Sequence, residues 1–94
     1  MQAHSIYKIP QGKLVKITMK YHDTNRTIIS IQITGDFFAY PEEAIEFLES
    51  ELKHCPLERD RLVTKITQVM QEKRIECIGL TPEGLTTAIM MCVP

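Results

Sequence analysis

Cys55 and its neighbour His54 are the side chains in this sequence best suited to covalent chemistry. A cysteine thiolate can attack or carry sulfur, and a positive neighbour or a helix N-terminus lowers its pKa. A helix that begins shortly after Cys55 would supply such a terminus. Packing is nevertheless the favoured role for Cys55, and also for Cys77 and Cys92, which lie in apolar stretches. Sulfur transfer through Cys55 stays as an alternative.

Two lysines flank a turn signal near the N-terminus. Lys8 and Lys13 lie on either side of residues 10–12, whose Pro-Gln-Gly sequence is typical of a turn. Two amines beside one loop can hold a carboxylate or a phosphate, and Gly12 would let a ligand or partner approach the backbone closely. The alternative is a solvated hairpin turn.

Two aromatic residues follow a Gly-Asp pair in the middle of the chain. Phe37 and Phe38 come directly after Gly35 and Asp36. Neighbouring side chains point to opposite sides of an extended backbone, so both rings cannot enter one core. We expect one ring to pack and the other to face a partner or a pocket. The alternative is a strand end whose apolar side chains staple the next helix.

No catalytic or nucleotide-binding signature is present, because the sequence contains no G-x-S-x-G, Walker A or G-x-G-x-x-G pattern. The three cysteines and three histidines form no C-x-x-C pair and no zinc-ligand spacing, so no metal site is expected. These absences favour a binding or assembly role over catalysis by this chain alone.

The charge is nearly balanced overall but uneven along the chain. Its 94 residues carry a formal net charge of −1, which disfavours a general nucleic-acid binder. The basic side chains outnumber the acidic ones by five to one in residues 1–35, whereas residues 36–60 hold eight acidic and two basic ones. We therefore expect a basic sheet side, able to meet an anion or an acidic partner, and an acidic helix side.

Hydrophobic alternation predicts an antiparallel hairpin in the N-terminal half. Residues 14–22 and 26–34 alternate apolar and polar side chains around a polar turn, and residues 5–9 can add a third strand. Ile29, Ile31 and Ile33 are predicted to share the buried face of the second run.

After Gly35 the apolar residues no longer alternate with polar ones but recur at the spacing of a helix. Pro41, followed by two glutamates, suits the first turn of a helix that stops near His54, and a second helix is expected from about Leu57 to Arg74. Residues 75–80 fit either a connector or a strand. Thr81-Pro82 predicts the start of a third helix, with threonine as its N-cap.

This order predicts an α+β fold with a single domain over residues 1–94. A small antiparallel meander of about three strands is followed by about three helices packed on one of its faces. The N-terminus carries no signal peptide and no stretch is apolar enough to span a membrane, so a cytoplasmic protein is expected.

Five segments, taken in order, resemble a known family. The segments are YKIP at residues 7–10, GKLV at 12–15, ITGDFF at 33–38, PEEAI at 41–45 and IGLTPE at 78–83. With these segments, the chain is similar to the small accessory domain of lipoate–protein ligase, which is the C-terminal part of bacterial ligases and a separate polypeptide in some archaea. The likeness extends over about residues 5–92.

The resemblance implies an accessory subunit that forms a heterodimer with a catalytic ligase subunit. That complex uses lipoate, ATP and Mg²⁺ to make lipoyl-AMP and then modifies a lysine of lipoyl domains. It also implies a fold similar to the SufE/IscU type, no catalytic residue and no cofactor bound by this chain alone. The residues expected to meet the catalytic subunit or to close its active site are Lys8, Gly12, Lys13, Gly35, Asp36, Phe37 and Phe38.

Two other functions stay open. One is a small sulfur-transfer protein of the SufE/IscU type that uses a cysteine. The other is an RNA-binding module that uses the basic sheet face, although this face lacks the exposed aromatic pairs that stack bases. The favoured interpretation involves neither nucleic acid nor membrane.

Overall fold

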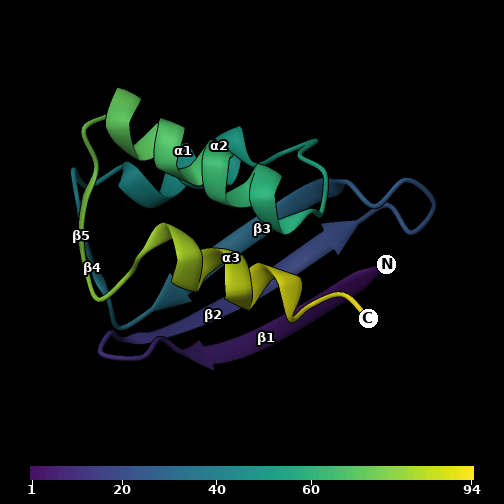
Figure 1. Ribbon diagram of the computed structural model, residues 1–94, viewed down its shortest axis with the longest axis horizontal. Helices are drawn as coiled ribbons and strands as arrows, with labels where there is room; N and C mark the ends of the chain where they lie inside the picture. Colours follow the sequence, from purple (N-terminus) through teal and green to yellow (C-terminus); the bar gives the residue numbers. More distant parts are fainter.

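The computed structural model describes residues 1–94 and has the predicted α+β architecture. Two sheets, one of three strands and one of two, accompany three helices (Figure 1). The elements in chain order are β1 (Gln2–Lys8), β2 (Leu14–Tyr21), β3 (Ile28–Gly35), β4 (Phe38–Tyr40), α1 (Ala44–Glu51), α2 (Arg59–Glu72), β5 (Glu76–Ile78) and α3 (Pro82–Met90).

The first three strands form the predicted antiparallel meander, in the order β1-β2-β3. β1 begins at Gln2, earlier than the expected segment 5–9, because Gln2 pairs with Lys20 and the β1–β2 ladder continues to Leu14 opposite Lys8. In β2 the side chains alternate as predicted, with Val15 and Ile17 buried and Lys16 exposed. The sheet therefore has one apolar face and one polar face.

The predicted buried face of β3 was wrong at its first position. The pairing between β2 and β3 shifts register between Lys20 and Tyr21, so that Tyr21 lies opposite Ile28. An extra residue in one strand moves the following side chains to the other face. Ile28 is consequently fully buried, whereas Ile29 is 39% exposed.

The first helix starts later than predicted. Pro41 and the two glutamates form a turn ahead of α1, in which the carbonyl of Pro41 accepts a hydrogen bond from the Ala44 amide at 2.9 Å. α1 ends at Glu51, before the expected stop near His54. The start of α3 is as predicted, because Oγ1 of Thr81 accepts a hydrogen bond from the Gly84 amide at 3.0 Å.

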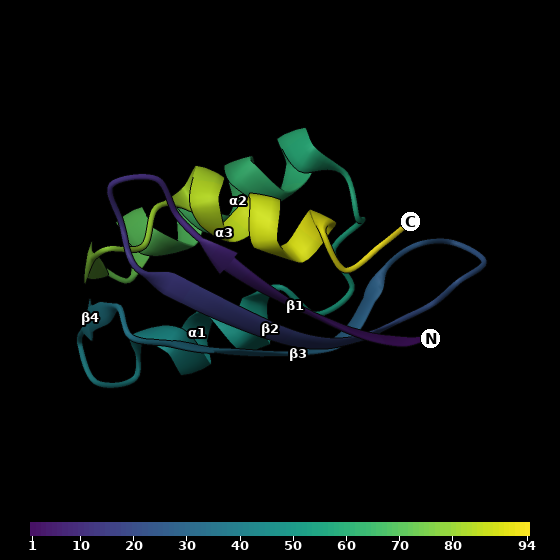
Figure 2. The ribbon, with the colours of Figure 1, turned by 90° about the horizontal axis from the view of Figure 1, so that it is seen from below.

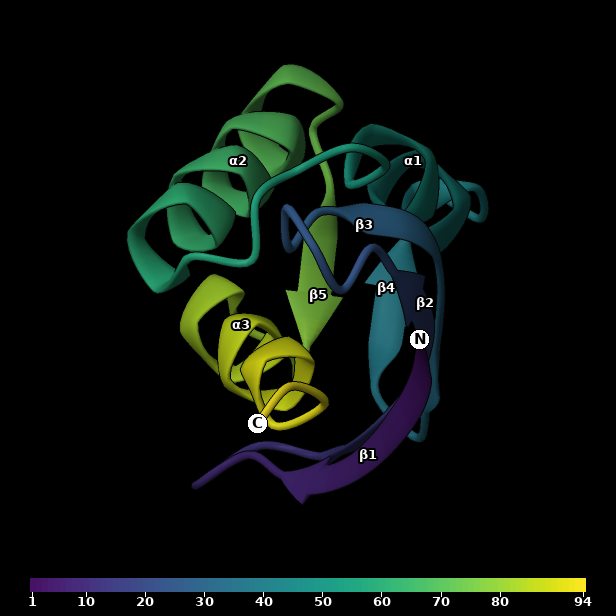
Figure 3. The same cartoon turned by 90° about the vertical axis from the view of Figure 1, so that its right-hand side faces the viewer.

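The helices cover the apolar face of the three-stranded sheet. α1 contacts β3, α3 contacts β1 and β2, and α2 contacts both other helices. The sheet curves so that α3 lies inside the bend, and α2 and α3 stand on the same side of it (Figures 2 and 3). None of the three helices has the length and apolar character that a membrane crossing requires.

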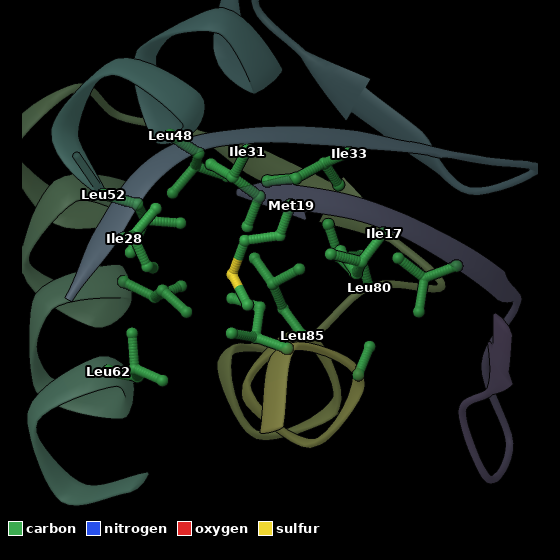
Figure 4. Packing of buried hydrophobic residues seen from close by; sticks show 14 of the residues in the cluster. Ile17, Met19, Ile28, Ile31, Ile33, Leu48, Leu52, Leu62, Leu80 and Leu85 are labelled. Atoms are coloured by element: carbon green, nitrogen blue, oxygen red, sulfur yellow. The ribbon is translucent and has the colours of Figure 1, made fainter. Parts of the chain in front are cut away.

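One cluster of buried side chains joins the sheet to all three helices. Met19 extends from β2 toward Leu85 of α3, while Leu48 of α1 lies over Ile31 of β3 (Figure 4). Leu62 brings α2 into the same cluster. This core fixes the sheet and helices as a frame for the loops at either end.

A two-stranded ribbon, β4–β5, lies apart from the meander. Phe38 pairs with Ile78 and Tyr40 with Glu76 in antiparallel register. The stretch 75–80, which fitted either a connector or a strand, thus contains a strand, and residues 38–40, which were not predicted to form one, are its partner. The ribbon lies at the same end of the molecule as the turn between β1 and β2 (Figure 1).

Candidate functional site

The turn between β1 and β2 is fastened to the end of β5. The amide of Lys13 donates a hydrogen bond to the carbonyl of Gly79 at 2.9 Å. Within the turn, the Gly12 amide donates to the Ile9 carbonyl at 2.8 Å and the Ile9 amide donates to the Lys13 carbonyl at 3.1 Å. Lys13 is therefore held by its backbone on both sides.

Glycine is needed at both contacting positions for packing within the chain. A Cβ on Gly12 would lie 2.9 Å from the Gly79 oxygen, and a Cβ on Gly79 would lie 2.2 Å from Cγ of Lys13. Gly79 also has φ +86°, a left-handed conformation that favours glycine. The absence of a side chain at Gly12 thus serves packing within the chain, because the Gly79 carbonyl lies where a Cβ would be. Contact of Gly12 with a partner stays a prediction.

The two lysines of the turn differ in how their amines are used. Nζ of Lys8 donates hydrogen bonds to the carbonyls of Gly12 at 2.7 Å and Ile9 at 3.0 Å, so it spans its own loop. Lys13 is exposed and forms no ion pair. Two of the three Nζ–H donors of Lys8 are therefore used within its own loop, whereas the Lys13 amine has no hydrogen-bond or ion-pair partner and is free to meet one.

Asp36 ties the entrance of the ribbon to the meander. Its Oδ1 accepts a hydrogen bond from the Leu14 amide at 2.9 Å, and its own amide donates to the Leu14 carbonyl at 3.2 Å. A Cβ on Gly35 would lie 2.2 Å from the same Leu14 carbonyl oxygen, so the two backbones touch there. The residues Gly12, Lys13, Gly35 and Asp36 are thus gathered at one end of the fold.

Phe37 and Phe38 differ in burial, as predicted. Phe37 is half-buried and packs against the core, whereas Phe38 is 66% exposed on β4. Because Phe38 and Ile78 are direct cross-strand partners, their side chains share one face of the ribbon. Ala39 and Cys77 face the opposite way and pack against the core.

Two exposed residues on the outer face of the ribbon, Tyr40 and Ile78, were not predicted from the sequence. Tyr40 is 64% exposed and Ile78 is 69% exposed, and both share the outer ribbon face with Phe38. The available signal was the alternation in Phe38-Ala39-Tyr40 and Glu76-Cys77-Ile78, which places the larger apolar side chains together. Three residues are too short a run to separate that pattern from a loop.

The cysteines do not have the environment of an activated nucleophile. Burial raises the pKa of the Cys55 thiol above its ordinary value of 9.0; Lys65 opposes this shift and Glu51 adds to it. Its Sγ donates to the Glu51 carbonyl at 3.6 Å. Burial also raises the pKa of Cys77 and Cys92. A raised pKa disfavours the thiolate, which weighs against the sulfur-transfer alternative.

No group of three or more His, Cys, Asp or Glu side chains gathers as a metal site would require. An open hollow of about 440 Å³ lies beside Cys55 and is lined mainly by polar residues of α2, among them Arg61 and Lys65. These two cations face acidic neighbours, since Arg61 pairs with Glu58 and Lys65 with Glu51, both at 3.3 Å. The hollow therefore offers no concentrated charge for a ligand.

The outer face of the meander is polar and basic. His4, Lys16 and Lys20 are exposed there, and β1, β2 and β3 contain no acidic residue. This agrees with the basic sheet side expected from the charge distribution. No Phe, Tyr or Trp joins these lysines on that face, so it lacks the pair of exposed aromatic rings that stacks RNA bases.

Comparisons with known proteins agree with the resemblance seen in the sequence. The family model of the bacterial lipoate protein ligase C-terminus matches residues 8–89. The search of curated proteins finds no match. Among solved structures, one similar chain comes from an archaeal lipoylation system of Thermoplasma acidophilum, described as a bi-partite lipoate protein ligase and its E2 lipoyl domain.

That chain is 27% identical to this one with a TM-score of 0.78, and the alignment covers 95% of this chain and 94% of the other. The family match includes the β1–β2 turn, the Gly35–Asp36 turn and the whole β4–β5 ribbon. With its sequence and its fold both in agreement, this chain belongs to the family of lipoate protein ligase C-terminal domains.

Proposed function

We propose that this chain is the accessory subunit of a two-component lipoate–protein ligase. It works with a catalytic subunit in the ATP-dependent activation of lipoate to lipoyl-AMP, and hence in the lipoylation of lysines on lipoyl domains. The observation that carries the proposal is the match over nearly the full length of both chains to a component of a bi-partite ligase system. Because the matched chain has nearly the same length as this one, the match supports a role for this chain as the smaller subunit of such a two-part ligase.

The chemistry of this chain supports an accessory role. Its thiols have raised pKa values, no three metal-ligating side chains gather, and the Lys8 amine is occupied by its own loop. In this proposal the catalytic subunit supplies the lipoate, ATP and Mg²⁺ sites. The accessory chain holds the loops of that site in their productive geometry and helps to exclude water while charge develops on the phosphates.

The proposed contact surface is the end of the fold where the β1–β2 turn meets the ribbon. Lys8 shapes the turn, Gly12 and Gly35 allow the close backbone contacts, and Asp36 fastens the ribbon entrance. Phe37 anchors this end to the core, which leaves Lys13 and Phe38 to face the catalytic subunit. We propose the cytoplasm as the place of action, where ATP is available.

The test is lipoyl-AMP formation from lipoate, ATP and Mg²⁺ by the catalytic subunit of the same organism, with and without this chain. We expect adenylate formation to depend on the chain and to saturate as the chain is added. The control is the same titration with heat-unfolded chain. A catalytic subunit that forms lipoyl-AMP equally well alone would contradict the proposal.

A further inference from the structure

The outer face of the β4–β5 ribbon has the composition of a binding surface. Its large residues point away from the core, and its small ones, Ala39 and Cys77, point inward. In a strand pair that serves only its own fold, the larger apolar residues would be expected inside. The apolar ribbon face, as we define it, consists of Phe38, Tyr40 and Ile78.

The apolar ribbon face is large for so small a chain. With about 200 Å² for a fully exposed large side chain, its three residues leave on the order of 400 Å² uncovered. That area lies in the range of the largest patches on ordinary monomers, which are often functional. Its concentration on a ribbon with only three residues in each strand makes it a specific feature rather than scattered exposure.

Charged side chains border this face asymmetrically. Glu76 is the direct cross-strand partner of Tyr40, and Glu42 and Glu43 follow two and three residues after Tyr40. At the opposite end of β5, Gly79 contacts Lys13, whose amine is free. The face therefore has an acidic border and a basic border, which can fix the orientation of a partner with the reverse arrangement.

We propose that the apolar ribbon face is the anchor by which this chain binds an apolar surface of the catalytic ligase subunit. This inference rests on the proposed function. A second copy of the chain is a poorer occupant, since two such faces would bury only about 800 Å² in total, which is less than specific interfaces require. A larger partner that also contacts Lys13 and Asp36 would bury the additional area that a specific interface requires.

Within this interface, Phe38 and Tyr40 are the anchors and Ile78 fills the space beside Phe38. Aromatic residues at the centre of an interface carry most of the binding free energy, while the charged rim contributes orientation. The ribbon presents them rigidly, because Asp36 fixes the start of β4 and the Lys13–Gly79 hydrogen bond fixes the end of β5. Prior ordering of this kind lowers the entropy cost of association.

The experiment measures the affinity of the full-length chain for the catalytic subunit by isothermal titration calorimetry. Phe38→Ser, Tyr40→Ser and Ile78→Ser are compared with wild type. We expect the two aromatic substitutions to raise Kd on the order of 30-fold each and Ile78→Ser to raise it about 10-fold. Circular dichroism of each variant verifies that the chain is folded.

Two matched controls lie outside the proposed surface. Ile6→Ser removes an isoleucine that is 62% exposed on a strand of the meander. Met91→Ser removes an apolar side chain that is 51% exposed directly after α3. The C-terminus, which follows α3, lies at the end of the fold away from the ribbon (Figure 1). We expect both to leave Kd within about twofold of wild type, as for residues outside an interface.

The outcomes separate this inference from the proposed function. If the ribbon variants bind as wild type does, and adenylation still depends on the chain, the proposed function stands and the assignment of the surface is overturned. Sedimentation of the chain alone as a dimer that Ile78→Ser dissociates would overturn it in favour of self-association. If wild type does not bind the catalytic subunit at all, the proposed function itself fails.

Discussion

The two sheets of this molecule place their large apolar side chains in opposite directions. In the meander, Val15 and Ile17 are fully buried while Lys16 between them is exposed. In the ribbon, Phe38 and Tyr40 are exposed while Ala39 between them packs against the core. The side chains of both sheets alternate with a period of two, so the sheets differ only in whether the larger residues lie on the inner or the outer face.

This contrast separates side chains that stabilise the fold from those available to a partner. Full burial of a side chain such as Ile17 contributes about 1.5–3 kcal/mol to folding. Ile78 is of the same type but remains largely in water, so it contributes little until something covers it. A position in a β-strand therefore does not by itself reveal which of the two free energies, of folding or of binding, a residue serves.

The largest expected effect is on stability in the meander. Ile17→Ala leaves a cavity in the core, and we expect it to lower the free energy of unfolding by about 2–5 kcal/mol. Ile78→Ala, the matched substitution in the ribbon, should lower it by less than about 0.5 kcal/mol, as for most exposed positions. Urea unfolding followed by circular dichroism measures both. Equal losses would abolish the contrast between the two sheets.

The next effect lies where the two sheets meet. Gly79→Ala places a Cβ against the side chain of Lys13, at a position whose φ is +86°. We expect it to lower the free energy of unfolding by about 1–3 kcal/mol. Lys13→Ala removes the nearer of the contacted carbon atoms, so the double variant should regain part of that loss. A double-mutant cycle with no coupling would show that the turn and the ribbon are not in contact.

The meander was predictable from the sequence because its pattern is local and long. Eight alternating residues in β2 define a buried face without reference to any distant part of the chain. The phase of β3 was not predictable at its start, because the register shift at Lys20 and Tyr21 depends on pairing between strands. The cap at Thr81 is also local, and its prediction is confirmed.

The ribbon could not be predicted, because each of its two strands is identified as a strand only by its pairing with the other. Residues 38–40 and 76–78 are short and are separated by two helices. The candidate site was therefore predicted in part. Phe38 was found through the unusual Phe-Phe pair, but Tyr40 and Ile78 became visible only when pairing placed them beside it. Similarly, nothing in the sequence showed that the Lys8 amine would be used by its own loop.

A smaller effect is expected at the hydrogen bond that joins meander and ribbon. Asp36→Ala removes the acceptor for the Leu14 amide, and a single exposed hydrogen bond contributes about 0.5–1.5 kcal/mol. Asp36→Asn keeps an oxygen acceptor and should lose less than half as much. We expect hydrogen exchange at Leu14 to accelerate more in Asp36→Ala than in Asp36→Asn. Identical exchange in the two variants would show that this side chain does not hold the ribbon entrance.

The smallest effect concerns the inner face of the ribbon at alkaline pH. Burial raises the pKa of Cys77 above 9.0, which means that the folded chain holds the thiol proton more tightly than the unfolded chain does. The stabilisation from this proton is complete below pH 9 and is lost as the pH rises through the folded-state pKa. The free energy of unfolding should therefore fall above pH 9.

Cys77→Ala isolates this contribution, because other groups that titrate at alkaline pH are shared by both chains. Between pH 8 and pH 10 the variant should lose less stability than wild type, as measured by urea unfolding at each pH. Cys92→Ala is the matched control on the meander side, where burial by the core also raises the thiol pKa. If Cys77→Ala follows the wild-type pH dependence while Cys92→Ala does not, the inner face of the ribbon is open to water, and the ribbon is a mobile flap rather than a fixed platform for its aromatic residues.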